Sequence, residues 1–379
     1  MKTVVALAKC AQYRPEIIKP ALDKVFTAIG GLKQFIPSGG SVLIKPNLLT
    51  DRSPEKGVTT HPEIVRALIR LVRQHGGNPF IGDSPAGTLK IESVLEKTGF
   101  HALCAEEAVK FVFLEKEPCV SHDYRGISLA ITQTAIDADL IINVPKLKTH
   151  SFTLFTNAVK NVFGLLPGYQ KILLHKTFPT PDQFGDCLAF LYGIVKPALT
   201  VCDAVTAMEG GGPTCGTPIQ LGFLAASSDG VALDLAMCNL LKINPNHVGY
   251  LNSLRRSGIG ESDQKNIELT GDTNELKNLR PIKQPGAARA ARFIPRRLVK
   301  FIEPYVWIAP DFLETCTACG RCVQACPTKA LTSNSPHHPI LNRRKCIACC
   351  CCHENCPENA IKMTCSPLLA IIARRRSIN

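Results

Sequence analysis

The chain carries one cysteine pattern twice, first as Cys316-Thr-Ala-Cys319-Gly-Arg-Cys322-Val-Gln-Ala-Cys326-Pro327 and then as Cys346-Ile-Ala-Cys349-Cys-Cys-Cys352-His-Glu-Asn-Cys356-Pro357. The two copies are 30 residues apart, and each ends in a Cys-Pro pair. This run is typical of bacterial ferredoxins, in which cysteine thiolates hold [4Fe–4S] clusters. The pattern therefore predicts a small ferredoxin-type module with two [4Fe–4S] clusters.

The spacing also predicts which cysteines share a cluster. In each run the first three thiolates reach three irons of one cluster, and the cysteine before proline crosses to the other cluster. We therefore expect one cluster on Cys316, Cys319, Cys322 and Cys356, and the other on Cys346, Cys349, Cys352 and Cys326. Fully ligated clusters of this kind conduct electrons, so any substrate chemistry is expected elsewhere in the chain.

A zinc site is the main alternative for these cysteines. Zinc takes four ligands per ion, usually as two close pairs far apart in the sequence, and this explains two complete cysteine triads poorly. Cys350 and Cys351 interrupt the second run and leave its register ambiguous, although Cys349 and Cys352 preserve both spacings. Cys365 lies outside the pattern and is interpreted as a small core residue.

The chain has 379 residues and a formal net charge of +13. Two clusters with four thiolates each would lower this to about +9. Basic residues gather at 289–300 and 374–376, but no aromatic-interleaved basic motif is visible, so we expect no nucleic-acid partner. The 18 cysteines without an export-type leader predict a cytoplasmic protein. No apolar run reaches about 18 residues, and no membrane span is expected.

Residues 1 to about 280 alternate between short apolar runs and amphipathic segments. The expected strands are Val4–Leu7, Val42–Lys45, Phe80–Asp83, Lys110–Leu114, Ile127–Ile131, Leu140–Val144, Leu199–Asp203 and Leu221–Ala226. The expected helices are Pro62–Gln74 with Thr60 as its N-cap, Asp182–Val195 and Asp229–Leu241. This alternation predicts an α/β fold, with a mostly parallel three-layer sheet domain followed by a small α+β ferredoxin-type dicluster domain.

The composition divides the chain into four expected parts. They are an α/β domain with a ligand-binding edge at 1–280, a basic proline-containing connector at 281–310, a two-[4Fe–4S] ferredoxin domain at 311–365 and a basic tail at 366–379.

Polar side chains follow several of the expected strands. Because the carboxyl ends of parallel strands share one edge of a sheet, we expect a ligand site at that edge. Lysines there would hold an anionic group, and histidines would relay protons. The predicted catalytic residues are Lys146, Lys148, His150 and His175, and the predicted substrate-binding residues are Lys45, Asn47, His61, Asp83, Lys160, Asn161, Asp203 and Glu209.

Each of these residues also has a purely structural interpretation. An aspartate after a strand often caps a helix, and a single lysine is usually solvated. The turn Gly210-Gly211-Gly212-Pro213 lacks the spacing of a dinucleotide-binding or P-loop motif. A shared polar site is the interpretation that accounts for the whole set.

Three blocks in this part of the chain resemble a known family. They are Asn143–His150, Lys160–Gly164 and Glu209–Pro213. The family is the uncharacterised iron–sulfur family catalogued as domain-of-unknown-function family three-six-two, and the resemblance covers roughly residues 1–260. Its members often pair this domain with a ferredoxin module. The resemblance implies the architecture described above and no settled reaction or substrate.

The leading hypothesis from the sequence is a cytoplasmic iron–sulfur oxidoreductase. A low-potential donor or acceptor protein would exchange electrons with the clusters, which would pass them to an anionic small-molecule substrate or cofactor. No flavin or NAD fingerprint is visible, and clusters rarely perform hydride chemistry unaided. A ferredoxin-like electron-transfer partner without its own substrate, and a cluster-containing maturation or scaffold protein, are therefore alternatives. The sequence leaves the substrate, the electron donor and the oligomeric state open.

Overall fold

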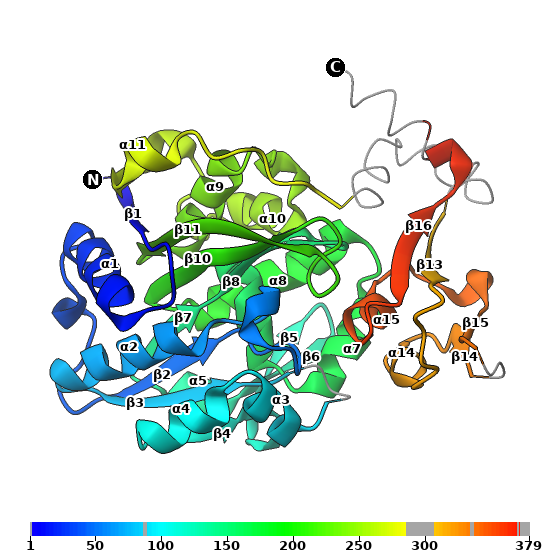
Figure 1. Ribbon diagram of the computed structural model, residues 1–379, viewed down its shortest axis with the longest axis horizontal. Helices are drawn as coiled ribbons and strands as arrows, with labels where there is room; N and C mark the ends of the chain where they lie inside the picture. The colour runs from blue at the N-terminus through cyan, green and yellow to red at the C-terminus, as the bar shows by residue number, and fades with distance from the viewer. Residues whose placement is uncertain (1, 86–88, 286–306, 334–336, 370, 372–379) are drawn as a thin grey trace.

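The computed structural model describes residues 2–85, 89–285, 307–333, 337–369 and 371. A large sheet flanked by helices forms the main body, and a smaller region with β13, β16, α14 and α15 lies beside it (Figure 1). Residues 286–306, which make up most of the predicted basic connector at 281–310, and residues 370 and 372–379 of the predicted tail lie outside the described residues. Within the described residues, no helix has the length and apolar character needed to span a membrane.

The main sheet has ten strands in the described part of the chain. Eight follow one path, in the order β12 (Ile267–Gly271), β1 (Thr3–Lys9), β11 (Thr217–Ser227), β10 (Leu199–Glu209), β7 (Leu140–Val144), β2 (Ser41–Pro46), β3 (Asn78–Asp83) and β4 (Phe111–Phe113). Along this path every neighbouring pair is parallel except the two pairs made by β11. The two remaining strands, β8 (Lys146–His150) and β9 (Leu154–Thr156), attach beside β10. The predicted mostly parallel sheet is confirmed.

Alternate residues of the strands pack against different helical layers, as the two-residue period of a strand requires. Ala6 and Ala8 of β1 belong to one apolar core with α1 (Pro15–Ala28), α2 (Pro62–Gln74) and α4 (Phe100–Glu106). Val5 and Leu7 belong to a second core with α8 (Pro181–Val195), α9 (Gly230–Leu240) and α10 (Gly249–Ser257). The domain therefore has the three layers expected from the sequence.

Shorter helices connect these elements. The α-helices are α3 (Ile91–Lys97), α5 (Gln133–Asp137), α6 (Ala158–Asn161), α7 (Gly168–Thr177) and α11 (Thr273–Leu276). The 3-10 helices are η1 (Leu32–Gln34), η2 (Pro54–Lys56), η3 (Leu114–Lys116), η4 (Val162–Leu165), η5 (Pro245–His247), η6 (Gln264–Asn266) and η7 (Arg343–Lys345).

Three local predictions need correction. The N-cap of α2 is His61 instead of Thr60, because the Thr60 hydroxyl donates to Val144 O at 2.6 Å and accepts from Asn47 N at 2.8 Å. The strand β10 runs past Asp203 to Glu209, because its second half pairs with the long strand β11. The predicted strand Ile127–Ile131 exists as β6 (Ile127–Thr132), but it pairs with β5 (Cys119–Tyr124) in a separate hairpin and not in the main sheet.

The smaller region combines short strands and single-turn helices, as the ferredoxin-type prediction requires. Its outer strands β13 (Ile308–Phe312) and β16 (Ile361–Cys365) are antiparallel, and so are β14 (Leu331–Thr332) and β15 (Ile340–Leu341). The helices α14 (Arg321–Gln324) and α15 (Cys351–Glu354) follow the second cysteine of each run. We call residues 307–365 the ferredoxin module.

Candidate anion-binding site and cysteine module

The cysteines of the ferredoxin module surround two hollows. One has a volume of about 310 Å³, including space open to solvent, and its lining includes Cys316, Cys319, Cys322 and Cys356. The other has a volume of about 330 Å³ on the same measure, and its lining includes Cys326, Cys346, Cys349, Cys350 and Cys352. The two sets of four cysteines predicted from spacing therefore each gather around one hollow, with Cys326 and Cys356 exchanged between the runs. Each set spreads around a volume, as thiolates that reach separate irons of one cubane must do.

The two halves of the module repeat their backbone geometry, which shows where the extra cysteines lie relative to the first run. Gly320 has φ +75° at the start of α14, and Cys350 takes the equivalent place before α15 with φ +65°. Cys350 thus stands where the first run has glycine, although a side chain is disfavoured in that region of backbone space. Cys351 is the first residue of α15 and does not line either hollow. The register with Cys349 and Cys352 as ligands stays our prediction.

The two crossing cysteines have matching hydrogen bonds. Ala330 N donates to Cys326 Sγ at 3.2 Å, and Ala360 N donates to Cys356 Sγ at 3.2 Å. Burial raises the pKa of Cys322 to about 11, so the free thiol would stay protonated at neutral pH. Iron binding requires the thiolate, and backbone N–H donors stabilise sulfur that carries negative charge. The two backbone N–H donors would therefore stabilise Cys326 and Cys356 as cluster-binding thiolates.

A third hollow lies at the carboxyl edge of the main sheet, with a volume of about 440 Å³. We call it the lysine hollow. It is lined by Lys45, Asn47, Leu49, Asp83, Ser84, Lys148, His150, Thr156, Lys160, Asn161, Phe163, Gly164, Lys171 and Pro213. Seven of the predicted catalytic and substrate-binding residues are in this set.

Lys45 and Asp83 form a buried ion pair at the end of β2 and β3. Lys45 Nζ donates to Asp83 Oδ1 at 2.8 Å, and Leu48 N donates to Asp83 Oδ2 at 2.7 Å. Burial lowers the pKa of Lys45, while the Asp83 charge opposes that shift. Gly164 packs directly against the pair, and a Cβ at that position would lie 2.6 Å from Lys45 Nζ. The ion pair therefore occupies space that any side chain at residue 164 would fill.

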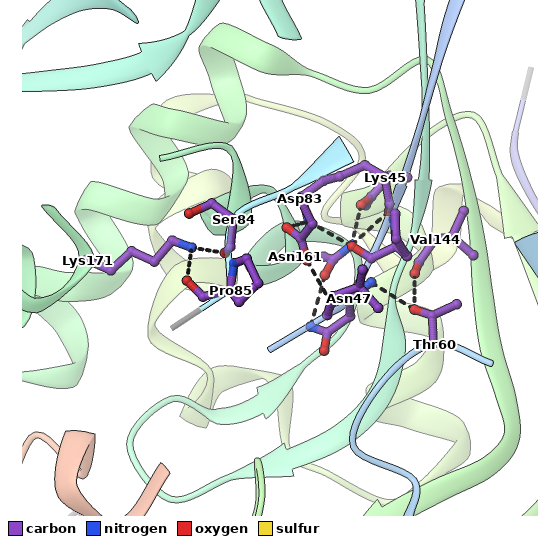
Figure 2. Close-up of polar contacts among 12 residues, drawn as sticks. Lys45, Asn47, Thr60, Asp83, Ser84, Pro85, Val144, Asn161 and Lys171 are labelled. Atoms are coloured by element: carbon purple, nitrogen blue, oxygen red, sulfur yellow. Dashed lines mark hydrogen bonds and ion pairs between the residues drawn. The ribbon is translucent and has the colours of Figure 1, made fainter. Parts of the chain in front are cut away.

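Three hydrogen-bonded amide side chains lie between this ion pair and Lys148, whose Nζ donates to Asn47 Oδ1. Asn47 Nδ2 donates to Asn161 Oδ1 at 3.0 Å, and Asn161 Nδ2 donates to Asn143 Oδ1 at 2.8 Å. Figure 2 shows Lys45, Asp83, Asn47 and Asn161 grouped together, with Lys171 reaching the carbonyl groups of Ser84 and Pro85. These bonds fix the amides, so their orientation is set before any ligand binds.

Lys148 and Lys160 have no carboxylate within 4.0 Å among the described residues. Lys148 Nζ donates to neutral groups, Val58 O at 2.6 Å and Asn47 Oδ1 at 3.2 Å. Lys160 Nζ lies over the Phe163 ring, 5.4 Å from its centroid. Burial lowers the pKa of both lysines, that of Lys148 well below its usual range, and their mutual repulsion adds to the effect on Lys148. Two lysines without an ion-pair partner therefore face the same hollow, and an anion bound between them would favour their charged forms.

His150 completes this side of the hollow. Its Nδ1 accepts from Phe152 N at 3.0 Å and Thr153 N at 3.3 Å, so the proton of the neutral ring sits on Nε2. Burial and Lys160 lower the pKa of His150 well below its usual range. Its Nε2 lies 3.3 Å from Glu354 Oε1 of the ferredoxin module, although the two atoms lack hydrogen-bond geometry. The ring is thus neutral, and it presents a buried donor.

The other predicted site residues lie outside the lysine hollow. Lys146 Nζ donates to Asp203 Oδ2 at 2.8 Å and to the Tyr13 hydroxyl at 2.7 Å. His61 stacks on Tyr13 with ring centroids 3.7 Å apart, and burial lowers the pKa of His61 to about 4. These residues form a separate polar cluster beside the hollow.

His175 and Glu209 also lie apart from it. His175 stacks on Phe184 at 4.4 Å, and burial together with Lys160 lowers the pKa of His175 to about 3. Glu209 accepts two bonds from Arg280, at 2.8 and 2.9 Å, and this pairing lowers the pKa of Glu209. Glu209 therefore has a charged partner, whereas His175 has ring contacts and its buried Nδ1 has no hydrogen-bond partner among the described residues.

The ferredoxin module contacts the α/β domain through α14, whose Arg321 Nη1 lies 3.5 Å from Asp51 Oδ1, and through α15 and the chain after it. The Arg52 guanidinium donates to the carbonyl groups of Cys356 and Thr214 and to Asn359 Oδ1. The Thr214 hydroxyl donates to His353 O at 3.4 Å. In Figure 1, α15 is on the side of the module that faces the main body.

Sequence reasoning missed Arg52, Tyr13 and Glu354. No local pattern marks them, because each acts on residues more than a hundred positions away. The residues that were predicted carry a local signal, because Lys146, Lys148 and His150 alternate along β8 and so share one face of a strand.

Comparison with known proteins agrees with this architecture. Residues 42–239 match the family described as domain of unknown function DUF362, over half of the chain. The chain belongs to the DUF362 family. The matched DUF362 region contains all the predicted catalytic and substrate-binding residues from Lys45 to Glu209. Residues 311–332 match the 4Fe-4S binding domain. The chain is therefore an iron–sulfur protein of the electron-transfer type, with at least one [4Fe–4S] cluster.

One curated relative and one solved structure illustrate what the chain is similar to. The thylakoid-associated protein sll1697 of Synechocystis sp. is 34% identical over 257 residues, which are 67% of this chain and 79% of that protein. The lactate racemase apoprotein from Thermoanaerobacterium thermosaccharolyticum matches with 16% identity and a TM-score of 0.43, over 64% of this chain and 58% of that chain. The match with the racemase thus covers less than two thirds of that chain's length.

Proposed function

We propose that this DUF362 protein is a cytoplasmic iron–sulfur oxidoreductase. Electrons from a low-potential donor protein would enter two [4Fe–4S] clusters and pass to an anionic organic substrate or cofactor in the lysine hollow. The observation that carries the proposal is the pair Lys148, which is fully buried, and Lys160, which is half-buried, two lysines without an ion-pair partner among the described residues.

Two such cations point to an anionic ligand. Removing a charge from water is costly unless an opposite charge or hydrogen bonds compensate for it. A carboxylate or phosphate between Lys148 and Lys160 would supply that compensation, and burial would strengthen the attraction. The apolar surface of Leu49 and Phe163 in the same hollow suits the carbon skeleton of an organic molecule.

The proposed chemistry is reduction of a double bond or carbonyl group. Two one-electron transfers from the clusters and two protons would add two hydrogens to the substrate, and the donor protein would be oxidised by two electrons. His150 Nε2–H would donate a hydrogen bond to the substrate, a protonated lysine of the hollow would supply a proton, and water would replace that proton. Lys45, Asn47, Asp83 and Asn161 would orient the substrate. Lys146, His61 and Asp203 would support the edge of the hollow, since they already bond to one another.

A reductive titration tests the proposal. The full chain would be reconstituted anaerobically with iron and sulfide and titrated with dithionite while its visible spectrum is recorded. We expect about eight irons per chain and reversible bleaching by two electrons. Mass spectrometry of gently purified protein should then reveal a retained anionic small molecule, and Lys148→Met should lose it with the iron content unchanged. Clusters that dithionite cannot reduce would rule out the proposed electron flow.

An electron-transfer partner without its own substrate is the second candidate. The exposed Cys319 at the first cysteine hollow favours it, because it brings that hollow to the surface, where another protein could exchange electrons. In that case Lys148→Met should leave electron transfer to an acceptor protein unchanged and no small molecule should be retained.

A further inference from the structure

The ferredoxin module points the side chain of Glu354 toward the α/β domain. This residue ends α15, between the predicted ligands Cys352 and Cys356, and its side chain is only 11% exposed. Its Oε1 lies 3.3 Å from Nε2 of His150, a residue that is fully buried and lines the lysine hollow. Neither atom has a hydrogen-bond partner among the described residues.

The repeat inside the module shows that this contact is particular to the second half. Gln324 ends α14 just as Glu354 ends α15, and the two positions are 30 residues apart. Gln324 is exposed, whereas Glu354 is buried against the α/β domain. Cluster binding therefore does not require a carboxylate at this position, and the reason for Glu354 must lie in what it faces.

Glu354 faces the two unpaired cations. The charge of Glu354 opposes the lowering of the pKa of both Lys148 and Lys160 by burial, although neither Nζ lies within 4.0 Å of its carboxylate. Asp83, which lines the hollow, is bound to Lys45, whereas Glu354, which contacts the lining residue His150, has no such bond among the described residues. Glu354 is thus placed to offset part of the positive charge without occupying the space of a ligand.

We propose that Glu354 is a specificity-determining residue of the lysine hollow, supplied by the ferredoxin module, which sets how much negative charge a ligand can carry. This inference rests on the proposed function, because it takes the lysine hollow as the anion site. It makes the anion site composite, since the site has its full set of charges only while α15 is docked on the α/β domain.

The test compares two anions of similar shape and different charge. Sulfate carries two negative charges and methanesulfonate carries one, at any pH near neutral. Binding of each to the reconstituted full chain is measured by isothermal titration calorimetry in mildly alkaline buffer. Since electrostatic energy is proportional to ligand charge, Glu354→Gln should tighten sulfate binding about tenfold and methanesulfonate binding about threefold.

Two further variants make the result decisive. Glu354→Ala should also tighten both anions, because it removes the same charge, and Gln324→Ala should change neither because residue 324 is exposed. Iron content is measured in every variant to show that the clusters remain. Anion affinities that are unchanged or weakened in both Glu354 variants would overturn the inference and leave the anion site in place. If neither anion binds the wild-type chain or Glu354→Gln, the anion site of the proposed function fails as well.

Discussion

Gly164 should not tolerate a side chain, because its Cα packs against the buried Lys45–Asp83 pair. A Cβ at residue 164 would lie 2.6 Å from Lys45 Nζ and closer still to Asp83 Oδ1. Non-bonded carbon contacts are normally about 3.5 Å. Gly164→Ala must therefore separate the pair or shift the chain near Ser84, whose N–H donates to Gly164 O at 3.1 Å.

The structure gives the size of the expected effect. Overpacking a core costs about 1 to 3 kcal/mol, and breaking a buried ion pair costs about 3 to 5 kcal/mol. A loss of about 3 kcal/mol in the free energy of unfolding is therefore expected. For a domain of this size each kcal/mol shifts the melting temperature by roughly 2 °C, so the midpoint should fall by about 6 °C.

Circular dichroism of the anaerobically reconstituted chain would measure this shift, at matched iron content. Gly211→Ala is the control, because a Cβ there would have no neighbour nearer than 3.4 Å and the residue lacks a left-handed φ. Sulfate affinity should also fall in Gly164→Ala, since Lys45 and Asp83 line the lysine hollow. Equal melting temperatures for both variants and the wild-type chain would refute the role given to Gly164.

Four other outcomes are expected. Lys160→Met should weaken sulfate binding at least about tenfold by calorimetry, because it removes a unit charge that lines the hollow; an unchanged affinity would count against the anion site. Arg52→Ala should speed iron loss to a chelator, measured from the visible spectrum, because Arg52 holds the carbonyl of Cys356; the exposed Lys56→Ala is its control. The free energy of unfolding should fall as pH falls from 6.5 to about 3, because His175 takes up a proton in the unfolded chain, where its pKa is near 6.5, but not in the folded chain, where its pKa is about 3. His175→Phe should flatten that part of the stability curve in urea unfolding, and an unaltered curve would contradict the assignment. Removing iron anaerobically should unfold the ferredoxin module and leave the main sheet intact by hydrogen exchange, because metal binding supplies folding energy to small modules.

A contact between the electron-carrying module and the lysine hollow has a mechanistic consequence. If a substrate binds beside Glu354, its charge acts on a residue that lies two positions from a predicted cluster ligand on either side. Anion binding should then alter the electron paramagnetic resonance spectrum of the reduced clusters. The effect should disappear in Glu354→Ala and persist in Gln324→Ala.

The sequence was sufficient where the cause is local. The helix Pro62–Gln74 has its predicted bounds, because proline at the first helical position and the apolar spacing of the segment are both encoded within it. The exchange of Cys326 and Cys356 between the two hollows follows from the spacing of each run. The parallel sheet likewise follows from the alternation of apolar and amphipathic segments.

Only the tertiary structure decided which polar residues have partners. Lys146 and Lys148 are two residues apart on β8 and share a face, yet Lys146 is bound to Asp203 while Lys148 contacts only neutral groups. Glu354 reaches His150 from a position about two hundred residues away in the chain. The physical reason is that spacing fixes how neighbours along one element are arranged, whereas the pairing of charges depends on which distant elements pack together. The sequence therefore determined the cysteine module and the layered sheet, and the packing of α15 against that sheet determined the charges of the candidate site.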